Sequence, residues 1–234
     1  MSKIQWDQTG ERLYETGVDH AVVYPYNKTS SKYAPGVAWN GITSVNESPS
    51  GAEENALYAD NIKYLAPRSR EEFGATVEAY TYPDEFATLD GTAEIVSGMR
   101  IGQQTRGLFG LSYRTLIGND VDGDDHGYQL HLIYGATASP SEKSRETVNE
   151  DPDAVQFSWE IATVPVAVTG FKPTSHITID STKFDTTERK ALLAALEAKL
   201  YGTDAGTGTE ATDPELPLPD EVATLLGYTA ESGD

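Results

Sequence analysis

Apolar and polar residues alternate in short segments along most of the first 180 residues of the chain. An alternation of period two is typical of a β-strand with one buried and one polar face. It is clearest in residues 154–168, where one face would carry Val155, Phe157, Trp159 and Ile161, and the other Gln156, Ser158 and Glu160. This pattern and a high content of β-branched and aromatic residues predict eight strands, at 19–26, 36–45, 56–65, 74–82, 108–117, 128–136, 154–168 and 176–180. The chain is therefore expected to be mainly β.

The dipeptide Asn40-Gly41 falls inside the second predicted strand. This dipeptide is a strong signal for a two-residue hairpin turn. A hairpin would leave two pieces too short to pair well, and a glycine bulge within one strand explains the same residues. Both interpretations stay open at this point.

One helix is predicted at about residues 186–200. Asp185 would be its N-cap, with Glu188 three residues later in a capping-box arrangement. Leucines recur at helical spacing along one side, at Leu192, Leu193, Leu196 and Leu200, and Gly202 would end the helix. Shorter helical turns are predicted at 83–91 and 220–228. We expect the leucine stripe to cover the apolar face of the sheet and the other face to stay polar.

The chain is predicted to have three parts: an N-terminal arm at 1–17, a β domain at 18–202, and an acidic Gly/Thr/Pro-rich extension at 203–234. The extension contributes strongly to a formal net charge of −20. So acidic a surface repels DNA on average, because proteins that grip DNA neutralise its phosphates with Lys and Arg. The same acidity also keeps a protein soluble.

The chain contains no cysteine, which excludes disulfides, thiolate metal sites and thiol nucleophiles. No apolar run approaches the roughly 18 residues that a membrane helix needs. Residues 1–17 lack the apolar core of a secretory signal. We therefore expect the protein to fold in the cytoplasm in which it is made and to have no membrane partner.

Four aspartates form a conspicuous cluster: Asp120, Asp122, Asp124 and Asp125. The first three have the spacing of a calcium-binding loop. The sixth position of such a loop would be Asp125 rather than glycine, and the twelfth would be His131 rather than glutamate. Asp and Gly residues between two strands are also typical of a turn, so we predict a solvated hairpin tip.

His131 lies between Leu130 and Leu132, and the alternation places it on the polar face of a strand rather than in a metal site. The four histidines form no HExxH pair, and phosphate-loop, dinucleotide-loop and nucleophile-elbow patterns are absent. We predict no catalytic residue, no metal and no cofactor. The chain is not expected to be an enzyme, although an enzyme with a dispersed carboxylate pair remains an alternative.

Four strings are more specific than a generic strand pattern: NESPSGAE, LYADNIKYL, EAYTYPDEF and LIYGA. Through them, roughly residues 13–200 resemble the major tail proteins, or tail tube proteins, of long-tailed, non-contractile phages of Gram-positive bacteria. The resemblance implies two packed antiparallel sheets, forming a curved half-barrel or sandwich, with one flanking α-helix. It also implies that six copies form a ring, that the rings stack into the tail tube of the virion, and that genome DNA passes through without specific binding.

The partners implied by the resemblance are further copies of the chain, a tape-measure protein, tail assembly chaperones, a tail terminator and a distal tail protein. The tube would be assembled in the host bacterial cytoplasm, and no catalytic residue exists in the family. The competing hypothesis is a calcium-dependent carbohydrate-binding β-sandwich whose aspartate hairpin holds the ion.

A bore through which DNA slides is expected to lack basic patches, because each Lys–phosphate contact would retard the DNA. The bore candidates are Glu72, Glu78 and Glu160, for which ordinary outer surface is the alternative. Residues 1–17, 26–36 and 44–55 are expected to reach neighbouring rings. The inter-subunit candidates are Arg68, Arg70, Arg100, Arg106, Tyr33, Glu53 and Glu54. Intrachain salt bridges are the alternative use of these arginines and of Arg114.

Overall fold

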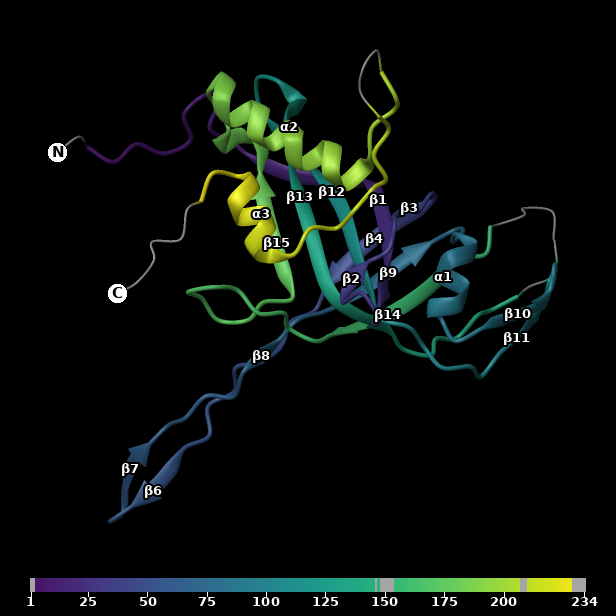
Figure 1. The fold of residues 1–234 in the computed structure, drawn as a ribbon. Coiled ribbons are helices and arrows are strands. Elements are labelled where there is room, and N and C mark those ends of the chain that lie inside the picture. The colour runs from purple at the N-terminus through teal and green to yellow at the C-terminus, as the bar shows by residue number, and fades with distance from the viewer. Residues whose placement is uncertain (1–2, 146, 148–153, 207–209, 229–234) are drawn as a thin grey trace.

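The computed structural model describes residues 3–145, 147, 154–206 and 210–228 (Figure 1). Its longer strands are β1 (Tyr14–Asn27), β4 (Ile42–Glu47), β7 (Ile62–Leu65), β9 (Gly74–Ala79), β10 (Ala93–Val96), β12 (Phe109–Asn119), β13 (Gly123–Ala138), β14 (Phe157–Thr163) and β15 (His176–Asp180). The short strands are β2 (Lys32–Tyr33), β3 (Val37–Ala38), β5 (Ser50–Gly51), β6 (Leu57–Ala59), β8 (Glu71–Glu72) and β11 (Met99–Ile101). The helices are α1 (Asp84–Leu89), α2 (Thr187–Tyr201) and α3 (Pro219–Leu225), with a 3₁₀ turn at Ser181–Lys183. The prediction of a mainly β chain is confirmed.

Nine strands form one antiparallel sheet in the order β2-β1-β12-β13-β14-β9-β4, with β3 also paired to β1 and β15 to β13. Strand β13 bends at Gly135, which has a φ of 59° and where a Cβ would lie 2.2 Å from the carbonyl oxygen of Val164. Residues before the bend pair with β15, and residues after it pair with β14. The sheet thereby folds into two layers, β1-β12-β13-β15 and β14-β9-β4. The predicted sandwich-like arrangement is present, built from a single continuous sheet.

The first core lies between these two layers and is rich in aromatic side chains. Trp159 of β14 is fully buried at its centre, with ring centroids 5.3 Å from Trp39 and 5.3 Å from Phe86. Phe86 comes from α1, so the helical turn predicted at 83–91 is present and closes one end of this core. Tilted and edge-on aromatic pairs of this kind add to the stabilisation given by burial alone.

The second core lies on the opposite face of β1 and β13, under α2. Leu193, Leu196 and Leu200 of α2 are buried there against Leu130 and Leu132 of β13, whereas Leu192 is only partly buried. The central strands are therefore covered on both faces. The expectation of one polar face holds only for the outer layer, where β14 alternates between buried and exposed residues as predicted.

Helix α2 confirms the helix predicted at about 186–200, but its N-cap and its first residue each lie one position later than predicted. The N-cap is Thr186, whose hydroxyl oxygen accepts a hydrogen bond of 3.3 Å from the backbone N–H of Arg189. Asp185 was the wrong choice between two adjacent residues that both have a suitable side-chain oxygen. Gly202 follows the helix with a φ of 75°, as expected for its end.

Two of the predicted strands are divided by turns. At Asn40-Gly41 the chain passes from β3, which pairs with β1, to β4, which pairs with β9. This turn is therefore neither a hairpin nor a bulge but a crossing between the two layers. Residues 56–65 form the β6–β7 hairpin, because Asp60 and Asn61 both have a positive φ.

The segment after Gly202 belongs in part to the folded body, so the boundary predicted there is not a structural one. Leu216 and Val222 are each only 2% exposed and complete the second core. The hydroxyl of Tyr134 donates a hydrogen bond of 3.0 Å to the carbonyl oxygen of Pro217. Helix α3 accounts for the helical turn predicted at 220–228. Across the described ranges, no helix is both long and apolar enough to cross a membrane.

Candidate functional site

A two-stranded ribbon, here called the β-arm, spans residues 50–72 and projects from the body of the protein at the lower left of Figure 1. It is built from the β5–β8 pair, a bridge between Glu54 and Arg68, and the β6–β7 hairpin. Its outer half carries large apolar and aromatic side chains in solvent: Leu57, Tyr58, Ile62, Tyr64 and Leu65. Tyr58 and Tyr64 are both 72% exposed. Exposed apolar side chains gathered in this way on one short segment are typical of a surface that another molecule covers.

A second hairpin, formed by β10 and β11, projects on the other side of the body (Figure 1). Ile95, Val96 and Met99 are exposed on it. Arg100 anchors the hairpin through a hydrogen bond of 2.5 Å to Asp84 at the start of α1. The two projections place exposed apolar side chains on two different sides of one chain.

Strands β4 and β15 are open edges of the large sheet. Within the described residues, β4 pairs only with β9, and β15 pairs only with β13. An open edge presents unpaired N–H and C=O groups, to which a strand of another molecule can add. The short strands β2 and β3 also pair on one side only, with β1, but β4 and β15 are the longer of these edges at which the sheet could continue into a neighbour.

The acidic bore candidates fall in two different places. Glu78 of β9 and Glu160 of β14 share the outer polar face of the layer β14-β9-β4. On this face the Glu78 carboxylate accepts hydrogen bonds from Ser44, at 2.8 Å, and Gln156, at 3.2 Å. Glu72 lies elsewhere, exposed in β8 at the base of the β-arm. The structure brings two of the three candidates together and leaves the third apart.

Four of the inter-subunit candidates lie on the β-arm, namely Glu53, Glu54, Arg68 and Arg70, and all four are exposed. Glu54 lies at the centre of a small charge cluster. Its carboxylate contacts Lys63 and lies 4.0 Å from the Arg68 guanidinium. These charges are positioned beside the apolar part of the arm.

The other three candidates are engaged within the chain. Arg100 pairs with Asp84, as described above. Arg106 donates hydrogen bonds of 2.9 Å to Asp90 and 2.8 Å to the carbonyl oxygen of Ala138. Tyr33 is buried in the second core, where its hydroxyl oxygen accepts from the backbone N–H of Gly135 at 3.0 Å. Tyr33 and Arg106 are therefore part of the folded body and not contact residues on a free surface.

The aspartate cluster lies at the β12–β13 hairpin tip, as predicted, and it holds the N-terminal segment. Asp120 accepts a hydrogen bond of 2.9 Å from the backbone N–H of Gly10, and Asp124 accepts one of 2.8 Å from the Tyr14 hydroxyl. Tyr14 already belongs to β1, so the N-terminal arm is shorter than predicted. Within the part of the chain that the structure describes, the aspartates of this tip do not bring three potential metal-ligand atoms close together.

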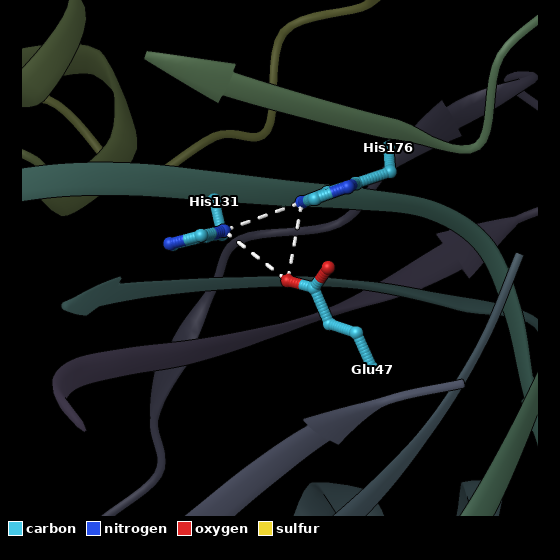
Figure 2. Close-up of side chains that lie close together, drawn as sticks. All are labelled: Glu47, His131 and His176. Atoms are coloured by element: carbon cyan, nitrogen blue, oxygen red, sulfur yellow. Dashed lines mark hydrogen bonds and ion pairs between the residues drawn. The ribbon is translucent and has the colours of Figure 1, made fainter. Parts of the chain in front are cut away.

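Three potential metal-ligand atoms do lie close together at Glu47, His131 and His176, which come from β4, β13 and β15 (Figure 2). The Nδ1 atom of His131 lies 3.3 Å from Nε2 of His176 and 3.4 Å from Oε1 of Glu47. The third side of the triangle, from His176 Nε2 to Glu47 Oε1, measures 3.7 Å. The three atoms point toward one another across the gap between the two layers of the sheet.

The surroundings of this cluster fix its charge state. The pKa of Glu47 is lowered to about 2, first by its hydrogen bond with His131 and then by that with Tyr113, whose hydroxyl lies 2.6 Å away. Burial lowers the pKa of His176. The hydrogen bonds therefore favour the carboxylate form of Glu47, and burial favours the neutral form of His176.

The structure corrects the prediction for His131, which is only 6% exposed and does not face solvent. The alternation with leucines was real, but the face on which His131 lies is covered by the second layer of the sheet. Glu47 and His176 were not singled out in the sequence, since the three residues are more than 40 positions apart from one another. No short-range signal could have joined them.

No protein-family model matches the chain, and no curated protein is significantly similar to it.

Proposed function

We propose that this protein is the structural subunit of a phage tail tube, and that it works only when many copies join into stacked hexameric rings. The observation that carries the proposal is the β-arm, an apolar ribbon held in solvent away from the body. An isolated two-stranded ribbon is marginally stable in water. An exposed ribbon with five large apolar side chains is best explained by a surface on another molecule that covers it.

The arrangement of the projections favours a head-to-tail contact between copies. The β-arm and the β10–β11 hairpin leave the body on different sides, so one copy can reach a neighbour while being reached by another (Figure 1). A heterologous contact of this kind closes into a ring where the rotation allows, and rings can stack into a filament. The open edges β4 and β15 support the same assembly, because pairing them between copies would cover these two edges.

The polar outer face of β14-β9-β4 is the proposed lining of the bore. It carries Glu78 and Glu160, and its neighbouring outward residues Ser44, Asn46, Thr76 and Ser158 are uncharged. A lining without Lys or Arg does not hold phosphates, so DNA can move along it. In this proposal the protein is a virion component without catalytic activity. Its partners are the tape-measure protein, the assembly chaperones, the terminator and the distal tail protein.

Sedimentation velocity over a wide range of protein concentration tests the proposal. We expect the wild-type chain to form large species at high concentration, and the variant Tyr58→Ser/Tyr64→Ser to stay monomeric. Both tyrosines are exposed, so the variant should keep the thermal stability of the wild type. The matched control is Tyr80→Ser, which removes an exposed tyrosine outside the β-arm and should assemble normally. The proposal would be contradicted if the Tyr58→Ser/Tyr64→Ser variant formed large species at the same protein concentration as the wild type.

A further inference from the structure

We propose that Glu47, His131 and His176 bind one divalent transition-metal ion of the zinc class, which ties β4 to β13 and β15. This site is independent of the tail-tube proposal, because all three ligands come from one chain. It lies between the two layers of the sheet, where an ion would link β4 of one layer to β13 and β15 of the other (Figure 2).

The distances between the ligand atoms are those of a tetrahedral site. Bonds of about 2.0–2.1 Å to zinc, directed to the corners of a tetrahedron, separate neighbouring ligand atoms by about 3.3–3.4 Å. The observed separations are 3.3, 3.4 and 3.7 Å. An ion can therefore enter with shifts of a few tenths of an ångström, without rebuilding the strands.

The ligand types select the class of ion. Two imidazoles with one carboxylate form a set typical of zinc and of neighbouring first-row metals. Calcium and magnesium prefer six or more oxygen ligands, of which Glu47 supplies at most two. The fourth position faces an open cavity of about 390 Å³, lined in part by Glu15, Thr115, Gln129 and Thr178, and a water molecule can occupy it.

Hydrogen bonding around His131 prepares its Nδ1 atom to bind a metal. The Thr115 hydroxyl donates its proton to Glu15 at 2.5 Å, so its oxygen is left to accept from Nε2 of His131 at 3.0 Å. The Nε2 atom therefore carries a ring proton, and Nδ1 is the nitrogen that faces Glu47 and His176. A proton that Nδ1 shares with the Glu47 carboxylate would be released when the ion binds. A metal-binding histidine that donates its other N–H to an oxygen is the usual arrangement.

Aromatic neighbours hold both rings in place. Tyr113 stacks on His131 with ring centroids 4.5 Å apart and planes 1° apart, and Phe73 stacks on His176 at 4.6 Å. The two imidazole rings are themselves nearly parallel, with an interplanar angle of 7°. Little side-chain freedom is left to lose on binding, so the site is preorganised.

The inference is tested by adding zinc to protein from which a chelator has removed metal ions. Isothermal titration calorimetry measures the binding, and thermal unfolding measures its effect on stability. We expect one tight zinc ion per chain and a melting temperature several degrees higher, because an ion that binds only the folded state stabilises it. Cobalt at the same site should give the intense visible absorption of a tetrahedral complex. Zinc bound weakly to the many surface carboxylates is distinguished from zinc at this site in two ways. It exceeds one ion per chain, and excess calcium displaces it.

Three variants locate the site. His176→Gln should abolish tight binding, and Thr115→Val, which removes the acceptor for His131, should weaken it by about 10–100-fold. The control His126→Gln alters a histidine at the β12–β13 hairpin tip and should bind as the wild type does. The inference is overturned if folded wild-type protein takes up no zinc and gives no tetrahedral cobalt spectrum. Wild-type affinity and stoichiometry in His176→Gln would overturn it as well. The wild-type cobalt spectrum decides the matter should the variant fail to fold.

Discussion

Glu78 of β9 and Glu160 of β14 project from the same face of two neighbouring antiparallel strands. The residue directly opposite Glu78 is Ser158, which lies two positions before Glu160, so the two carboxylates are diagonal neighbours. They give one face of the outer layer a negative charge, while its other outward residues are uncharged. In the proposed tube, this face would be repeated around the bore by every subunit.

Reversing the charge of this face should slow DNA without preventing assembly. We expect Glu78→Lys/Glu160→Lys particles to have normal tubes and a reduced rate of DNA ejection, because the lysines would bind phosphates in the bore. The effect should weaken at high salt. Ejection can be followed by the fluorescence of a dye that binds released DNA.

The matched control for this experiment is Asp185→Lys, which reverses an exposed charge just before α2. Its ejection rate should equal that of the wild type. If the double variant also ejects DNA at the wild-type rate, the face does not line the bore or its charge has no effect on the DNA.

The leucine stripe of α2 should contribute unequally to stability. Leu196 is fully buried in the second core, and we expect Leu196→Ala to lower the free energy of unfolding by about 2–5 kcal/mol. Leu192 is only partly buried, so Leu192→Ala should cost roughly 1 kcal/mol. Urea unfolding of the unassembled chain measures both values. Equal losses in the two variants would mean that α2 does not pack as described.

The ion pair between Asp19 and Arg114 should make stability depend on pH. Two hydrogen bonds of 2.7 Å from the Arg114 guanidinium lower the pKa of Asp19 below its ordinary value of 3.8. A carboxylate with a lowered pKa in the folded state stabilises the fold above the unfolded pKa, and this stabilisation is lost as the pH falls through the folded pKa. Its contribution should therefore be complete at neutral pH and vanish in strong acid.

The variant Asp19→Asn should consequently be less stable than the wild type at neutral pH, by about 1 kcal/mol or less because the pair is partly exposed. The difference should disappear well below pH 3.8. The exposed Asp204→Asn serves as the control and should not change the urea midpoint at either pH. A difference of constant size across this range would show that Asp19 acts through something other than its charge.

The aspartates of the β12–β13 hairpin tip should hold the N-terminal segment and not calcium. We expect Asp120→Asn/Asp124→Asn to speed amide hydrogen exchange around Gly10 and Tyr14, whose contacts with these carboxylates it weakens. Calcium should not shift the melting temperature of the wild type. A calcium-dependent rise of several degrees that disappears in this variant would favour the carbohydrate-binding hypothesis instead.

The sequence predicted those parts of the fold that depend on local periodicity. The strand at Trp159 and the helix at Leu196 each carry their own signal, of period two and of helical spacing. The sequence predicted one strand at residues 56–65, where the structure has the β6–β7 hairpin of the β-arm. Apolar residues continue on both sides of Asp60 and Asn61 and hide the turn that these two residues form. The packing of the C-terminal segment depends on a few buried residues, such as Leu216, within a polar, Pro-rich stretch that resembles a linker.

The candidate sites were predictable only in part, for the same physical reason. The polarity of Glu78 and Glu160 follows from alternation within one strand each. The burial of His131 depends on which layer covers it, and that is decided by the bend of β13 and the crossing at Gly41. Contacts between layers join residues far apart in the chain, and no local pattern records them.

Electron microscopy of the concentrated wild-type protein, with three-dimensional reconstruction of any regular particles, is the most direct test of the claim that copies of this chain join through their arms and sheet edges. The account predicts hollow tubes of stacked six-subunit rings, with each β-arm covered by a neighbouring copy and the face of Glu78 and Glu160 turned to the bore. Particles that remain single subunits at every concentration and salt, with or without other tail proteins, would contradict it. So would tubes in which the β-arm stays in solvent.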